Sequence, residues 1–486
     1  MSRLDRFALV LFVVVLAYML WFVFVPPFVG YANSYDFTRQ SACLGLWQFI
    51  EGVDKTLGNH LFPATTLLFD GDLRPVACMR SSDNLFGWLI TLRHSPGQLL
   101  SMTEVGLAKI LLLGGGTAVL LWQAGALRLL LAVVFALLFS NWAYLSYANT
   151  LYLEFSVLMA GFWVLGAGAC LLAGDERPGR VLLGLLMLAL LWLGLSKQQY
   201  APLAALLAVL LAGFCWLRWR ALFMSAALGT CAVICVVGFS WFNPVSSLMM
   251  KGIDEANKTN TYFGAVLPAA RDQRAALQQL GLPESCLSAV GSTWYSQQGA
   301  RPCPQVVQVS RSRLPGLFVS QPDTLLVPLY QAVLRVRPFY PDYLGMLPPA
   351  SEAESAQKLA VARPLSFTWL LSLLPQAGYL MVLALLALSA LLSTLVLVLQ
   401  PRQVAALSVM QRGCLGLQVL GALTASYALF SSVFGDGYIE LIKHAVAFGL
   451  GLAFMLAAWP GALLGCIGVF RLRRSQTLLA IRQGLS

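Results

Sequence analysis

The chain alternates between long apolar runs and shorter polar connections. Ten of these runs approach the roughly 20 residues that a helix needs to cross the hydrocarbon core of a bilayer. The pattern therefore predicts an all-α polytopic membrane protein with about 10 transmembrane helices. The expected spans are 7–29, 105–122, 126–145, 153–173, 181–196, 200–216, 222–242, 376–399, 413–433 and 445–470.

Two connections are much longer than the others and polar enough to lie outside the membrane. The first covers 30–104. The second, 243–365, has helix-compatible stretches at 271–280 and 324–336, which favour a small, mainly helical cap packed on the membrane domain. The chain is expected to divide into an N-terminal transmembrane module, 1–242, which includes the first loop, the cap domain, 243–365, and a C-terminal transmembrane module, 366–486.

The placement of the arginines predicts the orientation. Arg3 and Arg6 precede the first apolar run, and no small-residue cleavage site follows it, so we expect this run to remain as a helix. Every second connection, together with the C-terminal tail, contains arginine: Arg128, Arg177, Arg180, Arg218, Arg220, Arg402, Arg412, Arg471, Arg473, Arg474 and Arg482. Because cytoplasmic connections are enriched in basic residues, both termini are predicted to be cytoplasmic and both long loops extracytoplasmic.

Composition agrees with a membrane protein. The chain is 58% hydrophobic and 11% charged, against about 45–50% and about 25% for soluble domains. This excludes an ordinary soluble enzyme, a disordered protein and a small disulfide scaffold. The net charge of +11 would suggest a nucleic-acid partner in a soluble protein. Here nearly all of the excess lies in the cytoplasmic connections, so no nucleic-acid partner is predicted.

The ten cysteines fall into two groups. Six lie in or beside the spans, where a free cysteine is a small buried apolar residue. The other four, Cys43, Cys78, Cys286 and Cys303, lie in the two long loops. An even number in an oxidising compartment favours disulfides, and the simplest pairing is Cys43 with Cys78 and Cys286 with Cys303, although four cysteines allow three connectivities. No metal-ligand spacing supports the competing metal site.

Six ionisable residues remain near the extracytoplasmic ends of the spans: Lys109, Glu154, Lys197, Asp436, Glu440 and Lys443. Each could be a side chain that extends to the membrane surface from a helix end. Ionisable groups within spans are, however, usually turned towards a bundle interior or a cavity. Because all six lie on the side of the long loops, we interpret them as one outward-facing polar site.

Two of the surrounding segments allow both a structural and a functional interpretation. Asp36 and Arg39 would share a face if the turn after the first span is helical, either as a plain ion pair or as a base beside an anion clamp. Glu154 would open a span, where an acid also pairs favourably with the helix dipole. The segment from Lys197 to Tyr200 interrupts two apolar runs without a packing reason, which favours a ligand contact.

The last extracytoplasmic turn, 435–444, is the densest polar cluster beside any span. On one helix, Asp436, Glu440, Lys443 and His444 would follow each other at i, i+4, i+7 and i+8 and share a face. Lys443 and His444 are suited to neutralise a phosphate, while a self-paired solvated face is the alternative. Asp436 with Glu440 gives only a weak indication of a divalent cation, so we assign no metal ligands and no certain cofactor.

The layout resembles the GT-C class of integral-membrane glycosyltransferases. In that class an acid follows the first span, here Asp36, and an amphipathic loop and about ten further apolar runs come after it. The chain is more closely similar to a bacterial subgroup of glycan-biosynthesis hexose transferases. The residues that carry this second resemblance are 260–264 (Asn-Thr-Tyr-Phe-Gly), 277–282, 309–311, 320–322, 435–438 (Gly-Asp-Gly-Tyr) and the Lys443-His444 pair.

The resemblance implies transfer of a sugar from a polyprenyl-phosphate donor at the periplasmic face of a bacterial inner membrane. The acceptor would be an envelope glycan, a lipid or a protein. Asp36 is the implied general base, and Lys443 and His444 are the implied contacts to the donor phosphate. Many members have two adjacent acids in the first loop, but Phe37 follows Asp36. Either Glu154 or an acid such as Asp70 or Asp72 would then complete the site.

Chemistry assigns the remaining candidates. Inverting transfer needs a carboxylate within reach of the acceptor hydroxyl and donors for the departing phosphate. Arg39 and Lys197 join Lys443 and His444 as expected phosphate contacts. Glu154, Tyr200, Asp436 and Glu440 are expected to bind substrate.

Two other functions stay open. A lipid-linked-sugar flippase or transporter would need polar residues along a membrane path. An oligosaccharide polymerase or ligase would use arginines of the outer loop, such as Arg311, Arg313, Arg335 and Arg337.

Overall fold

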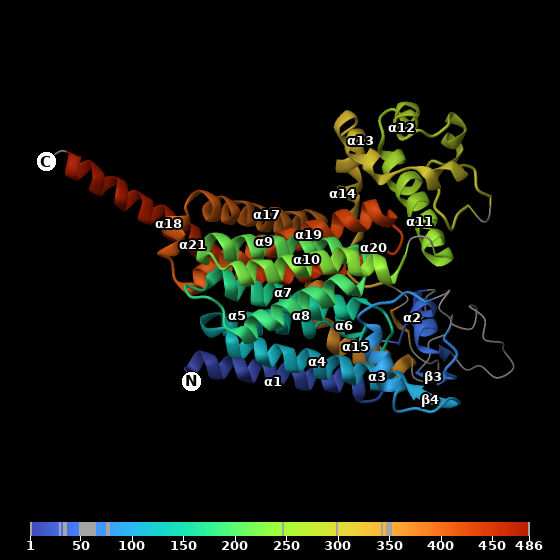
Figure 1. Ribbon diagram of the computed structural model, residues 1–486, viewed down its shortest axis with the longest axis horizontal. Helices are drawn as coiled ribbons and strands as arrows, with labels where there is room; N and C mark the ends of the chain where they lie inside the picture. Colours follow the sequence, from blue (N-terminus) through green and yellow to red (C-terminus); the bar gives the residue numbers. More distant parts are fainter. Residues whose placement is uncertain are drawn as a thin grey trace.

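A computed structural model describes residues 2–28, 31–32, 36–47, 65–73, 78–244, 247–297, 300–341, 344–346 and 352–484. The described chain is almost entirely helical and forms one elongated bundle with a smaller lobe at one end (Figure 1). Both termini lie toward the end of the bundle opposite this lobe. We call the end that carries the two long connections the cap end.

The predicted all-α membrane fold is confirmed. In the described part of the chain, eight helices are long and apolar enough to cross a membrane, and two apolar helices are shorter. The eight include α9 together with the short helix η3 before it. The ten helices are α1 (Arg3–Phe24), α4 (Met102–Gln123), α5 (Arg128–Phe139), α7 (Glu154–Ala173), α8 (Arg180–Ser196), α9 (Ala201–Trp219), α10 (Leu222–Phe242), α17 (Gln376–Leu399), α19 (Val409–Asp436) and α21 (Val446–Gly484).

Two helices, α5 and α21, differ most from their predicted lengths. α5 has 12 residues, or about 18 Å of helix, where 126–145 was expected, while α8, with 17 residues or about 26 Å, is short as expected from 181–196. α5 ends early because the Asn141 side chain accepts a hydrogen bond from the backbone N–H of Ala143 and caps a separate helix, α6 (Trp142–Leu145). α21 has 39 residues and projects well beyond the bundle at the C-terminus (Figure 1).

The bundle has a clear centre. In α7, 89% of the most apolar 18-residue window is buried, whereas the value for α17 is 22%. A helix that is apolar all round belongs in an interior, so α7 is the core helix and α17 lies at the periphery. α19 and α21 pack closely where Gly421 meets Gly451. A Cβ atom on Gly451 would lie 2.4 Å from the carbonyl oxygen of Gly421, and such small residues let two helix backbones approach.

In its described residues, the first long connection has two helices and most of the strands. α2 (Asp36–Leu44) packs against α3 (Asn84–Thr91), and the strands β2 (Leu46–Trp47), β3 (Thr66–Phe69) and β4 (Gln98–Ser101) form an antiparallel sheet in that order. β1 (Tyr31–Ala32) pairs with β5 (Leu344–Met346), so the first loop and the end of the cap are joined. β4 leads directly into α4, whose first turn is closed by a capping box of Ser101 and Glu104.

The second long connection is mainly helical, as predicted. Its helices are α11 (Leu248–Thr261), the π-helix η4 (Tyr262–Val266), α12 (Gln273–Leu280), α13 (Leu314–Ser320), α14 (Asp323–Arg335) and α15 (Glu352–Ala362), joined by short 3-10 turns. α16 (Phe367–Leu373) then leads to α17. α11 and α14 pack against α19, which places the cap over the end of that helix. The predicted domain limits, at residues 242 and 365, remain a prediction.

Candidate functional site

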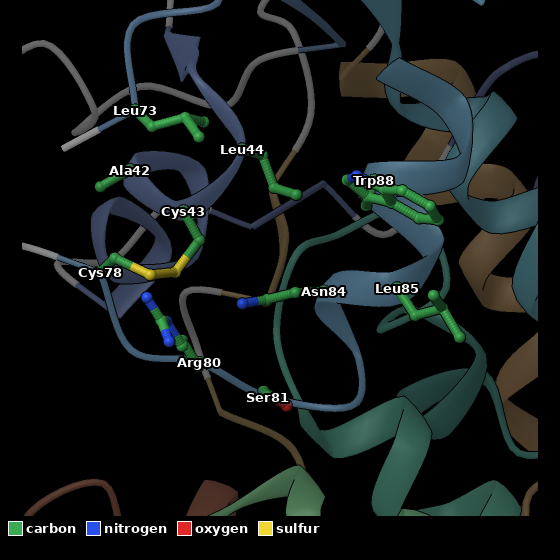
Figure 2. A pocket seen from close by; sticks show the side chains of 10 residues that line it. All are labelled: Ala42, Cys43, Leu44, Leu73, Cys78, Arg80, Ser81, Asn84, Leu85 and Trp88. Carbon is green, nitrogen blue, oxygen red and sulfur yellow. A yellow bond between two sulfur atoms is a disulfide. The ribbon is translucent and has the colours of Figure 1, made fainter. Parts of the chain in front are cut away.

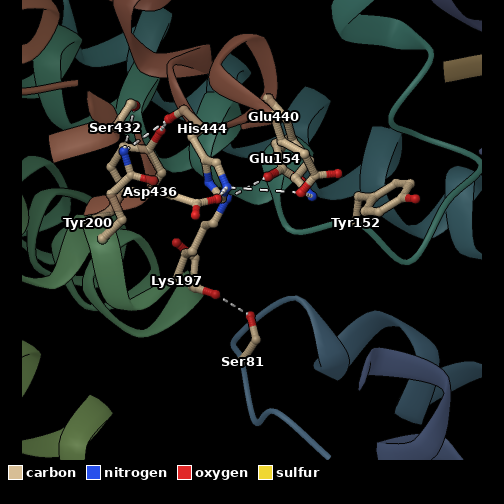
Figure 3. A network of polar contacts seen from close by, with 12 residues as sticks. Ser81, Tyr152, Glu154, Lys197, Tyr200, Ser432, Asp436, Glu440 and His444 are labelled. Carbon is tan, nitrogen blue, oxygen red and sulfur yellow. Dashed lines mark hydrogen bonds and ion pairs between the residues drawn. The ribbon is translucent and has the colours of Figure 1, made fainter. Parts of the chain in front are cut away.

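Most of the predicted polar residues meet at the cap end. Two short helices, η3 (Gln198–Tyr200) and α20 (Leu441–His444), lie between spans there and place side chains inside the bundle. The side chains that converge, called the cap-end cluster from here on, are Glu154, Lys197, Asp436, Glu440, Lys443 and His444. Figure 3 shows the cluster and labels its members other than Lys443.

Glu154 and Lys197 form a buried ion pair. The Nζ atom of Lys197 lies 2.8 Å from Oε1 of Glu154, and the Glu154 side chain is 2% exposed. Glu154 is the first residue of α7, while Lys197 has an extended backbone directly after α8, with φ −153° and ψ 139°. The break in the helix turns the lysine inward, so the predicted interruption of two apolar runs serves to place a cation.

His444 has a polar partner at each ring nitrogen. Nζ of Lys197 lies 3.0 Å from Nδ1, and Oδ2 of Asp436 lies 3.2 Å from Nε2. A lysine ammonium has only donors, and an ionised carboxylate has only acceptors. Nδ1 therefore accepts and Nε2 carries the proton, which defines a neutral imidazole. Glu154, Lys197, His444 and Asp436 form one continuous chain across the bundle.

The residues of the last turn do not share one helix face, and this part of the prediction was wrong. α19 ends at Asp436, Gly437 has φ 62° and Glu440 has φ 47°, so the chain leaves the helix before α20 begins. The side chains still meet, because the turn folds back on itself: Lys443 Nζ pairs with Glu440 and lies 5.6 Å from the Tyr152 ring centre. Lys443 is 1% exposed, so it is buried and does not extend to the membrane surface.

The cap reaches this turn through Asn260 at the end of α11. Its Nδ2 donates to Oδ1 of Asp436 at 2.8 Å, while its Oδ1 accepts from the backbone N–H of Trp294 at 2.8 Å. A Cβ atom on Gly437 would lie 2.4 Å from the Asn260 carbonyl oxygen. Only glycine at position 437 allows this close approach to Asn260. The cap is therefore held against Asp436, the carboxylate paired with His444.

Tyr200 and Gln199 fix the backbone of the cluster. The hydroxyl of Tyr200 donates to the carbonyl oxygen of His444 at 2.7 Å, and Nε2 of Gln199 donates to the same oxygen at 3.0 Å. Tyr200 is fully buried. The predicted substrate contact of Tyr200 stays a prediction, and its hydroxyl is already used to position His444.

Lys109 belongs to a second buried site, contrary to the expectation of one site for all six ionisable groups. Its Nζ lies 3.1 Å from Oδ2 of Asp83, and the Ser156 hydroxyl donates to Oδ1 of Asp83 at 2.6 Å. Burial raises the pKa of the Asp83 carboxyl, while Lys109 and Ser156 act in the opposite direction. Lys109 also donates to the carbonyl oxygen of Thr150 at 2.8 Å, so the turn that contains Tyr152 separates the two sites.

Asp36 and Arg39 lie on α2, which is helical as the prediction required. The Asp36 side chain lies outside the described residues. α2 is tied to the chain before α3, because Cys43 is bonded to Cys78 and the backbone N–H of Met79 donates to the Arg39 carbonyl oxygen at 3.1 Å. The simplest cysteine pairing is confirmed for this pair and for Cys286 with Cys303.

The two carboxylates that gave a weak indication of a divalent cation do not fit one. Asp436 accepts from Asn260 and is paired with His444, and Glu440 accepts from Lys443. These N–H groups, one of them the Lys443 ammonium, disfavour a divalent cation at the two carboxylates, although each carboxylate keeps lone pairs that can accept from hydroxyl groups. Among the described residues, no group of three or more His, Cys, Asp and Glu side chains is arranged to hold a metal ion.

Sequence reasoning missed Asp83 and gave no role to Asn260. A lysine two turns inside a span needs a buried partner, so Lys109 was a signal that a polar or acidic group is buried beside it. Asn260 opens one of the short motifs that carried the family resemblance. Its function as the cap's contact to Asp436 depends on a pairing 176 residues apart, which no local pattern indicates.

Fold and site together define a multi-pass α-helical membrane protein with a buried polar cluster at one end of its bundle. A family model described as the YfdI N-terminal transmembrane domain matches residues 2–474, and the chain belongs to this family. Comparison with curated proteins gave no significant match, and neither did comparison with solved structures.

Proposed function

We propose that this protein is a glycosyltransferase that moves a sugar from a polyprenyl-phosphate donor to an envelope glycan, lipid or protein acceptor. The reaction would take place at the cap end, on the periplasmic face of a bacterial inner membrane, with both termini in the cytoplasm. The family match supports the GT-C resemblance, because YfdI proteins form a GT-C-like family.

The observation that carries the proposal is the buried chain from Glu154 through Lys197 and His444 to Asp436. Buried ionisable groups in a membrane bundle are costly and typically mark functional sites. This chain of contacts lies at the cap end, where the first long loop and the cap meet the bundle, rather than along a path between the two ends of the bundle. Such a position suits chemistry on a lipid-linked substrate whose reactive end lies at the membrane surface.

In the proposed reaction the acceptor hydroxyl oxygen attacks the anomeric carbon of the donor sugar. The bond between that carbon and the phosphate oxygen breaks, the hydroxyl proton passes to Asp36, and polyprenyl phosphate leaves. Lys197 and His444, with side chains 12% and 16% exposed, remain within reach of a substrate. Lys443 is more deeply buried. We assign Lys443 to holding Glu440, and Asp436 and Glu440 to binding sugar hydroxyls.

The polymerase or ligase alternative receives less support from the structure. Arg311 pairs with Asp254 at 2.8 Å, and Arg313 donates to the Leu280 carbonyl oxygen. Arg335 lies over the Tyr438 ring, and Arg337 donates to the carbonyl oxygens of Ser372 and Leu374. All four arginines on which that alternative rested are engaged in contacts within the protein.

The flippase or transporter alternative requires polar groups through the membrane. Within the described spans, charged side chains lie near the helix ends. Lys109 is the charged residue that lies furthest into a span from the cap end, and it is paired with Asp83. This distribution favours an enzyme with a site at one face.

The proposal is tested by giving purified protein a polyprenyl-phosphate monosaccharide and candidate acceptors. We expect release of polyprenyl phosphate and formation of the glycosylated acceptor. Asp36→Asn should abolish release without changing the melting temperature. Full activity of this variant would show that the base is wrong. Activity only with a polyprenyl-diphosphate oligosaccharide would favour the polymerase or ligase.

A further inference from the structure

The charges of the cap-end cluster do not favour a phosphate by themselves. With His444 neutral, two lysines face three carboxylates, so the formal charge of the cluster is −1. A departing phosphate needs a cation that is not already neutralised. Arg80 meets this requirement: it is exposed, and its guanidinium has no ion pair or hydrogen bond among the described residues.

Arg80 belongs to a segment, 78–83, that is fixed against the bundle on one side. The backbone of Arg80 exchanges two hydrogen bonds of 2.8 Å with the Asn243 side chain. The hydroxyls of Ser81 and Ser82 donate to the carbonyl oxygens of Ser196 and Trp192, at 2.6 and 2.8 Å.

These bonds satisfy carbonyl groups that the end of a helix leaves unpaired. They terminate α8 at the point where Lys197 turns into the cluster (Figure 3). Ser81, the neighbour of Arg80 in the chain, is thus bonded to Ser196, the neighbour of Lys197.

The other side of the same segment lines a pocket of about 400 Å³ between α2 and α3, within the range for small-molecule sites. Its walls are mostly apolar, with Leu44, Leu73, Leu85 and Trp88, and the Cys43–Cys78 disulfide closes one side (Figure 2). Arg80 is the one ionisable side chain among the pocket's lining residues. An apolar pocket with one free cation suits an amphiphile that has an anionic headgroup.

The mouth of the pocket continues into an exposed apolar surface. Leu85, Trp88, Leu89 and Leu92 are 41–64% exposed and are spaced at i, i+3, i+4 and i+7, so they form one face of α3 and the residue after it. α3 is followed by β4 and then by the span α4, and an exposed apolar helix face close to a span is expected to lie in the bilayer interface. A lipid could then enter the pocket sideways from the membrane.

We propose that the pocket between α2 and α3 binds the phosphate end of a polyprenyl-phosphate carrier, with Arg80 as its phosphate contact and Trp88 and Leu85 against the first isoprene units. The inference rests on the proposed function, because it assigns the place of the donor lipid. It adds a cation to the site that neither the sequence pattern nor the cluster provides.

The test is a binding titration of the full-length protein in phosphatidylcholine nanodiscs with farnesyl phosphate. Arg80→Gln should weaken binding about tenfold or more, because a charge-assisted phosphate contact is lost. Trp88→Ala should weaken the binding of farnesyl phosphate and of farnesol to the same degree. Arg80→Gln should leave the binding of farnesol unchanged. The matched control is Arg93→Gln, an exposed arginine just after α3 that does not line the pocket, and it should bind as the wild type does.

Three results would overturn the proposal. Arg80→Gln within twofold of the wild type would remove the phosphate contact. Equal weakening by Arg93→Gln would indicate a general surface charge effect. Competition by phosphatidylglycerol in the nanodisc would indicate a site for any anionic lipid. Lipid binding can be measured without sugar transfer, so the two proposals can fail separately. If Arg80→Gln transfers the sugar with an unchanged KM for the donor, only the proposed lipid pocket is contradicted. If the protein binds farnesyl phosphate but transfers no sugar, only the proposed glycosyltransferase activity is contradicted.

Discussion

Nζ of Lys197 lies 3.0 Å from Nδ1 of His444, although the two residues are 247 positions apart in the chain. The same ammonium is paired with Glu154 on its other side. Because a lysine ammonium has only hydrogen-bond donors, Nδ1 of His444 must be the acceptor in this contact. The protonation state of His444 is thus set by a lysine from another helix, and the proton faces Asp436.

This arrangement predicts the tautomer of His444. In ¹⁵N-histidine-labelled protein we expect an Nε2-protonated neutral imidazole for His444, assigned by its loss in His444→Gln. His94 is an internal reference, because its Nδ1 lies 3.0 Å from the Ile90 carbonyl oxygen and must carry a proton there. Signals of an Nδ1-protonated ring for His444 would contradict the described contact with Lys197.

Removing the lysine should destabilise the protein. Lys197→Met leaves Glu154 buried without its partner, and breaking a buried ion pair on one side destabilises a protein by about 3–5 kcal/mol. Lys197→Met/Glu154→Leu removes both charges and should recover most of the melting temperature in detergent. As a control, Arg274→Met breaks the exposed Arg274–Glu284 pair and should change stability by at most about 1 kcal/mol. A double variant no more stable than Lys197→Met would contradict this account of the pair.

Two neighbouring glycines should respond in opposite ways. Gly437→Ala places a Cβ atom 2.4 Å from the Asn260 carbonyl oxygen at a φ of 62°, so we expect a loss of about 1–3 kcal/mol and weaker docking of the cap. Gly435→Ala is the matched control, since a Cβ there meets nothing within 4 Å. It lies in α19, where alanine is favoured over glycine. Thermal unfolding and proteolysis of the cap measure both effects. Equal stability of the two variants would argue against the close contact between Gly437 and Asn260.

Lys358 should titrate near physiological pH. It lies on α15, donates to the carbonyl oxygens of Val25 and Pro27, and partial burial lowers its pKa to about 8. Between pH 8 and the ordinary value of 10.5 the unfolded chain binds more protons at this site than the folded chain. Its contribution to stability therefore rises with pH over that window.

The pH profile of Lys358 acetylation, followed by mass spectrometry against a reference lysine peptide, checks this value. Lys358→Met should remove the corresponding rise in stability with pH. Half-maximal reactivity of Lys358 at the pH of the reference peptide would contradict the lowered pKa.

The sequence predicted those parts of the molecule that depend on local pattern. Apolar runs identified the spans, and the shared side of Cys43, Cys78, Cys286 and Cys303 identified the two disulfides. Glu154, Lys197 and His444 were expected together because charge within a membrane bundle must be paired or functional.

The remaining features depend on backbone geometry and distant contacts. The helix break at Gly437 and Glu440 requires positive φ angles. The spacing of the polar residues in this turn is that of a continuous helix, so it did not predict the break. Asp83 and Asn260 acquire their partners only when the first loop and the cap fold onto the bundle.

The most direct test of the central claim is release of polyprenyl phosphate from a polyprenyl-phosphate hexose by reconstituted protein. The wild type and Arg274→Met should release it at equal rates. Lys197→Met/Glu154→Leu, once shown to melt near the wild-type temperature, should be slower by about 100-fold or more, because the groups that stabilise developing charge are gone. Release by this folded double variant at the wild-type rate would contradict a catalytic role of the cap-end cluster.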